Sequence, residues 1–142
     1  MSPPARAGAL CMGLVLGACG AERGRDVLAG TSFTIVEIEG APVADAADGR
    51  PAELAFLDGA RFAASAGCNR ILGDVVQDGA ALHLTPGPMT KMACPEPVAS
   101  REEALVRALG EVTAHRRSGD ALELLAGDRV VVRLLGKPAA AP

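Results

Sequence analysis

Apolar and polar residues alternate repeatedly between residues 52 and 84 of the chain. Two Asp-Gly pairs, Asp58-Gly59 and Asp78-Gly79, interrupt this alternation. An Asp-Gly pair between alternating segments predicts a β-hairpin, because both residues tolerate the positive φ angles of a tight turn. A further strand is expected over residues 71–77. The middle of the chain is therefore predicted to be an antiparallel meander, with these inward-facing residues: Leu54, Phe56, Phe62, Ala64, Leu82 and Leu84.

Strands are also predicted on both sides of this meander. The first, over residues 32–39, changes its apolar face part-way, which predicts a bulge or a strong twist. Pro86-Gly87-Pro88 is expected to break the chain after the meander. Late strands are expected near residues 113–117, 121–125 and 129–135, the last with Val130, Val132 and Leu134 on one face.

One amphipathic helix is predicted over about residues 98–112. Its apolar residues recur at three and four positions: Ala104, Leu105, Ala108, Leu109 and Val112. Ser100 and Glu103 fit a capping box, with Pro97 just upstream where a helix can start. Glu102 is expected on the solvent-facing side, together with Glu103, Arg101 and Arg107. Together the elements predict a mostly β fold, a small antiparallel barrel or meander with this one helix.

Composition narrows the possible partners. The 142 residues are 49% hydrophobic, which is enough for the core of one domain. Only 2% are aromatic, so the core must be mainly aliphatic, and platforms for stacking nucleic-acid bases are lacking. The net charge of −3 has the wrong sign for a phosphate-binding surface. We therefore expect no nucleic-acid partner, and we expect a monomer.

The N-terminal residues predict an export signal. Arg6 supplies a positive charge, residues 7–16 form a short apolar segment, and Leu16-Gly17-Ala18-Cys19 ends it with small residues. These last four residues resemble the lipobox of bacterial lipoproteins, in which the cysteine is acylated. The alternative is an ordinary signal peptide in which Cys19 has no role. Gly20 follows the cysteine, and an Asp there would favour the inner membrane. We therefore expect an outer-membrane lipoprotein that faces the periplasm.

The expected domain organisation follows from these segments. Residues 1–18 are interpreted as the lipoprotein signal peptide and residues 19–30 as a tether. Residues 31–136 are interpreted as the folded domain, and residues 137–142 as a disordered Ala/Pro tail.

Cys68 and Cys94 are the two cysteines outside the leader. In an exported protein, two cysteines in loops favour a disulfide, and a pair of buried thiols is the alternative. A zinc site is not expected, because His83 and His115 lie in alternating strands without ligand spacing, and no other metal or cofactor is indicated. The sequence also offers no nucleophile with a base beside it, so we do not expect an enzyme.

Asn69 and Arg70 form a candidate interaction loop, because they are polar and lie beside a cysteine. The alternative is structural. Asn69 would then bond to the backbone of the turn, and Arg70 would pair with a nearby acid.

Two segments carry a resemblance to a known family. Ala66-Gly67-Cys68-Asn69-Arg70-Ile71-Leu72-Gly73 and Met89-Thr90-Lys91-Met92-Ala93-Cys94-Pro95 resemble the signature segments of the META domain family, which includes the heat-shock lipoprotein HslJ. The likeness covers about residues 31–135, with Phe33 where the family commonly carries Trp. It implies a lipocalin-like, mostly β fold, a place in the bacterial envelope, and a loose link to stress and drug tolerance. It implies no defined reaction and no active site.

The sequence thus favours a non-enzymatic, lipid-anchored envelope protein that acts through its surface on an unidentified envelope protein. One alternative is a lipocalin-like cup for a small apolar ligand or peptide, lined by Leu54, Phe56 and Val130. The other is an exported protease inhibitor that presents residues 67–70.

Overall fold

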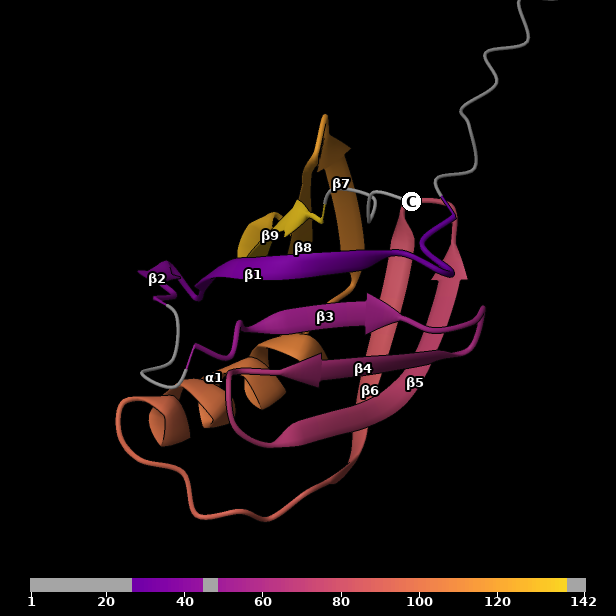
Figure 1. Cartoon of the computed structure of the whole chain (residues 1–142). Coiled ribbons are helices and arrows are strands. Elements are labelled where there is room, and N and C mark those ends of the chain that lie inside the picture. Colours follow the sequence, from indigo (N-terminus) through magenta and orange to yellow (C-terminus); the bar gives the residue numbers. More distant parts are fainter. Residues whose placement is uncertain (1–26, 45–48, 138–142) are drawn as a thin grey trace, which may run out of the picture.

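The computed structural model describes residues 27–44 and 49–137. Within them the chain forms one helix and a nine-stranded antiparallel sheet (Figure 1), so the expected mostly β fold class is confirmed. The elements are β1 (Ser32–Ile38), β2 (Ala41–Pro42), β3 (Glu53–Phe56), β4 (Arg61–Ser65), β5 (Arg70–Asp78), β6 (Ala81–Met89), α1 (Val98–Gly110), β7 (Ala114–Ser118), β8 (Ala121–Ala126) and β9 (Arg129–Gly136).

The sheet curves round until its two ends meet. Its strand order is β2-β1-β3-β4-β5-β6-β7-β8-β9, and β1 also pairs with β9. The ring is thinnest between β6 and β7, which are joined by the single pair Ala81 and Ala114. Because closure pairs most strand edges, few backbone groups are left open to another chain.

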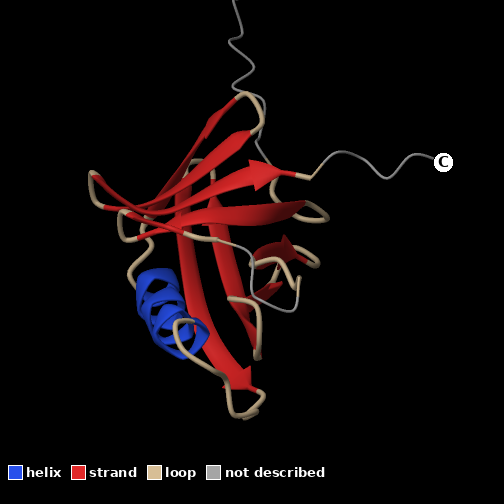
Figure 2. Cartoon of the chain, turned by 60° about the vertical axis from the view of Figure 1, so that its left-hand side comes forward, coloured by secondary structure: helices blue, strands red, loops and turns tan. Residues whose placement is uncertain are grey.

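The two ends of this barrel-like sheet are covered by different parts of the chain. The helix α1 packs against β1, β6 and β9, and Figure 2 shows it on one side of the curved sheet. Arg107 on α1 pairs with Glu39 after β1, with 2.7 Å between Nη2 and Oε2. The hydrogen bond from Arg107 lowers the pKa of Glu39. At the other end Leu28 is buried, and its N–H donates to Oε1 of Gln77.

The local turn predictions are confirmed. The turns between β3 and β4, β5 and β6, β7 and β8, and β8 and β9 fall at the expected Gly residues. At the first of these turns the Asp58 carboxylate accepts hydrogen bonds from the Ala60 N–H and from Arg61, and these bonds lower the pKa of Asp58. The bulge in β1 is also present, because its pairing with β9 shifts between Ile35 and Glu37. The bulge lets Ile38 face the core on the same side as Ile35.

Two sequence expectations about the bounds of strands and helices are wrong. Pro86-Gly87-Pro88 does not break the chain but lies inside β6, where the pairing with β5 shifts. Prolines fit there because this part of β6 has no strand partner on its other side. The helix also begins at Val98, so Ser100 is not its cap. Instead Oε2 of Glu96 accepts bonds from the Ser100 N–H and hydroxyl at 3.2 and 2.7 Å.

Side chains fill the interior of the barrel. Leu54 is completely buried, and Phe56 is 2% exposed and meets Phe33 edge to face. The Phe62 ring packs directly against the backbone of β5 at Gly73. A Cβ at this position would overlap the ring, so only glycine fits there. Val130 is only half-buried, since a bulge opposite Leu125 turns Val131 inward. A hollow of about 500 Å³ at the Leu28 end is lined by Phe56 but by neither Leu54 nor Val130, so only one of the three residues expected to line a cup lies against it.

Candidate functional site

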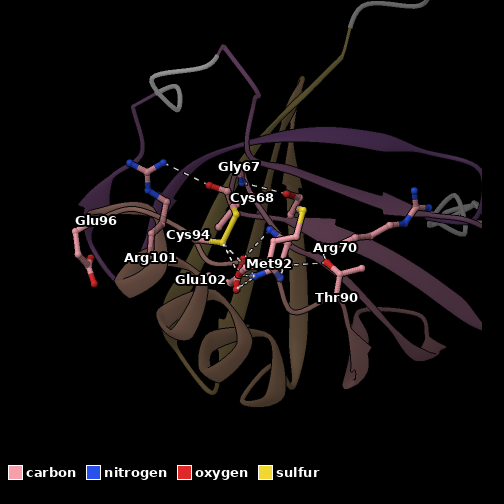
Figure 3. Close-up of a disulfide and its surroundings, with 12 residues drawn as sticks. Gly67, Cys68, Arg70, Thr90, Met92, Cys94, Glu96, Arg101 and Glu102 are labelled. Carbon is pink, nitrogen blue, oxygen red and sulfur yellow. Dashed lines mark hydrogen bonds between the residues drawn. A yellow bond between two sulfur atoms is a disulfide. The ribbon is translucent and has the colours of Figure 1, made fainter.

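The two segments with the family resemblance meet at a disulfide. Cys68 lies in the turn between β4 and β5, and Cys94 lies in the connection from β6 to α1. Their sulfur atoms are bonded, with 6.1 Å between the two Cα atoms (Figure 3). The expected disulfide is therefore present, and it joins the sheet to the segment that enters the helix.

Asn69 lies beside this disulfide and is 4% exposed. Its Oδ1 accepts hydrogen bonds from the Met92 N–H at 2.7 Å and from the Thr90 hydroxyl at 3.0 Å. Its Nδ2 donates to the Met92 carbonyl at 3.2 Å and to Oε1 of Glu102 at 2.8 Å. The side-chain amide thus uses its full hydrogen-bonding capacity, as a buried polar group requires. This geometry supports the structural alternative for Asn69.

Glu102 contradicts the expectation that it faces solvent. It is 6% exposed, and its Oε2 accepts the Asn69 backbone N–H at 2.9 Å while its Oε1 accepts the side-chain bond. The carboxylate, which comes from α1, thus accepts hydrogen bonds from both the backbone N–H and the side-chain amide of Asn69. We call Asn69, Glu102, Thr90 and Met92 the clamp. It holds together the β4–β5 turn, the β6–α1 connection and α1.

Sequence reasoning missed Glu102, although a signal for it exists. Val98, Glu102, Leu105 and Leu109 follow one another at spacings of four, three and four residues, which places them on one helix face. The other three are buried, so a carboxylate in this stripe must be buried as well. A buried charge needs hydrogen-bond partners, which indicates a contact with another segment.

Arg70 is placed differently from Asn69. Its backbone binds to Thr90 of the clamp. The Arg70 N–H donates to the Thr90 hydroxyl at 2.9 Å, and the Arg70 carbonyl accepts the Thr90 N–H at 3.1 Å. Its side chain is exposed and points away from the disulfide in Figure 3. Among residues 27–44 and 49–137, no acidic side chain forms an ion pair with its guanidinium. Of the two candidate interaction residues, only Arg70 offers its side chain to a partner.

The clamp has the chemistry of a structural support. Both cysteines are bonded, so neither supplies a thiolate, and the polar atoms of Asn69 and Glu102 are occupied by one another and by Met92 and Thr90. Within the described part of the chain, no group of three or more His, Cys, Asp or Glu could hold a metal ion. Gly67 and Asn69 are buried, so the turn at residues 67–70 does not present itself as an inhibitor loop.

The lipidation candidate Cys19 lies outside the described residues. In the described ranges no helix is long and apolar enough to cross a membrane.

The fold, the disulfide and the clamp define a small antiparallel β domain closed by one helix. The chain belongs to the META domain family, whose model matches residues 26–138. The resemblance found in the sequence is thereby confirmed. Membership in this family supports a non-catalytic, envelope-type domain.

Solved structures share the fold. An NMR structure of a protein from Burkholderia xenovorans is 23% identical, with a TM-score of 0.57, over 78% of this chain and 83% of that one. Another NMR structure is also 23% identical, with a TM-score of 0.61, over 76% and 91%. A crystal structure of a DUF4847 family protein from Bacteroides vulgatus is 16% identical, with a TM-score of 0.56, over 78% and 95%. At these identities the likeness shows the fold alone. The comparison with curated proteins gave no match.

Proposed function

We propose that this protein is a non-enzymatic, lipid-anchored protein of the cell envelope that supports the envelope under stress through contacts of its outer surface. The observation that carries this proposal is the META match over residues 26–138. The disulfide adds support, because such bonds persist in oxidising, exported compartments. The filled interior favours action at the surface over a ligand-binding cup.

The anchor in this proposal is Cys19, and the expected location is the outer membrane where the host has one. An acyl chain contributes about 0.8 kcal/mol for each CH₂ group that it buries, so several chains on one cysteine would hold the protein firmly. The residues between Cys19 and the first described residue, Val27, would then connect the lipid to the domain.

Cys19→Ala is expected to move the protein from the membrane fraction to the soluble exported fraction. Cell fractionation followed by immunoblotting measures this shift. Cys11→Ala is the matched control, because it removes another leader cysteine outside the Leu16-Gly17-Ala18-Cys19 segment and should leave the protein in the membrane. A Cys19→Ala protein that stays in the membrane fraction would show that the anchor is wrong.

The role under stress is tested in the same strains. Cells that lack the protein should survive envelope stress less well, and the wild-type chain should restore survival better than Cys19→Ala. Equal survival of all strains would exclude the stress role.

A further inference from the structure

The outer surface of the barrel is divided into two unlike regions. On β7, β8, β9 and β1, the side chains of Arg116, Glu123, Arg133 and Glu37 follow one another across four neighbouring strands. Each is paired with the next: Arg116 bonds Glu123, Arg133 lies 3.1 Å from Glu123, and Arg133 lies 3.2 Å from Glu37. These four charges are therefore paired with one another on the protein surface.

The outer face of β3, β4 and β5 carries a shallow groove instead. Its volume is about 270 Å³. The strand register places Ala55 beside Ala63, and their small side chains form its floor. Leu57 stands along one side with 44% of its surface exposed. Leu72, opposite Ala63 on the next strand, is 41% exposed and continues the apolar surface.

The other side of the groove is polar. Glu53, Ser65 and Arg70 follow one another across the three strands by register. Glu53 is neutralised by an ion pair with Lys137. Arg70 has no ion-pair partner within the described ranges. Its exposed guanidinium is therefore available to bind an acidic group at this groove. A guanidinium recognises a carboxylate through two parallel hydrogen bonds.

We propose that this groove binds an extended segment of a partner protein in which an apolar side chain stands next to an acidic one. The apolar side chain lies on Ala55 and Ala63 beside Leu57, and the carboxylate bonds Arg70. This assignment rests on the proposed function, because it names the chemistry that the outer surface recognises. The disulfide and the clamp support the site, since they fix the turn from which Arg70 enters β5.

A protein segment fits this face better than a membrane surface. The acidic residue Asp74 lies exposed on the outer face beside the groove floor, and its carboxylate would repel anionic lipid headgroups. The sequence also contains no Trp or Tyr, the residues that favour the membrane interface. The small floor accommodates one side chain, which suits an extended segment.

The test is an NMR titration of the ¹⁵N-labelled protein carrying Cys19→Ala, with the peptide acetyl-Ala-Leu-Glu-Leu-Ala-amide as the probe. Amide signals of Ala55, Ala63 and Arg70 are expected to shift, and Arg70→Gln should weaken binding about tenfold, as loss of a charged hydrogen bond does. Arg61→Gln is the matched control. Arg61 is exposed on the same face but already bonded to Asp58, so its loss should change binding less than about twofold.

Four binding results would overturn the proposal. They are no shift at these residues, equal weakening by the two Arg variants, equal binding of the peptide with Lys in place of Glu, and binding to phosphatidylglycerol vesicles that depends on Arg70. An Arg70-dependent dimer in analytical ultracentrifugation would assign the face to a second copy and would overturn it too. Because the titration uses purified protein, its failure is distinguishable from failure of the fractionation and survival experiments.

Discussion

Replacing Glu102 with alanine is expected to lower the free energy of unfolding by roughly 2–5 kcal/mol. The carboxylate is the acceptor for the backbone N–H and the side-chain Nδ2 of Asn69, and both residues are more than nine-tenths buried. Each buried donor left without an acceptor costs about 1–3 kcal/mol. Urea unfolding followed by circular dichroism measures the loss.

Glu103→Ala is the matched control for this variant. It removes the same side chain from the adjacent position of α1, where Glu103 is exposed. Its effect should stay within about 0.5 kcal/mol, as for most surface substitutions. Equal losses in the two variants would show that Glu102 is not held by Asn69.

Removing the disulfide is expected to cost about 3–3.5 kcal/mol by the chain-entropy estimate. The bond closes a loop between residues 26 positions apart, and without it the unfolded chain gains freedom. Cys68→Ser and Cys94→Ser should each lose about this much, and the double variant little more, because either change alone breaks the bond. The fold should persist, since Asn69 still binds the 90–92 segment to the β4–β5 turn.

The measurement is urea unfolding of the three variants and of the wild-type protein with and without reductant. Reduced wild-type protein serves as the control, because it loses the bond without a change of side chain. Its stability should match that of the double variant. A wild-type protein that unfolds at the same urea concentration in both conditions would contradict a stabilising role for the bond.

The features that sequence reasoning predicted correctly depend on neighbours in the chain. The turn at Asp78-Gly79 follows from a glycine that adopts a positive φ, whatever surrounds it. The turn at Asp58-Gly59 contains no positive φ, and there the Asp58 carboxylate accepts a hydrogen bond from the Ala60 N–H. The disulfide was expected from the predicted export signal and from the scarcity of other cysteines.

The features that it missed depend on contacts between distant segments. Glu102 was expected in solvent because it is charged, whereas its partner Asn69 lies 33 residues away in the sequence. Pro86-Gly87-Pro88 was expected to break the chain, but the missing neighbour on one side of β6 lets the prolines remain in the strand. The groove beside Arg70 likewise requires the register of three strands, which no local pattern contains.

A double-mutant cycle between Asn69 and Glu102 tests most directly the claim that the two signature segments are held on the helix by a buried clamp. Unfolding free energies are measured for Asn69→Ala, Glu102→Ala and the combined variant. We expect the combined loss to fall short of the sum of the single losses by about 1–3 kcal/mol, because each single change already breaks the bond between Nδ2 of Asn69 and Oε1 of Glu102. Losses that add to within about 0.5 kcal/mol would contradict the clamp.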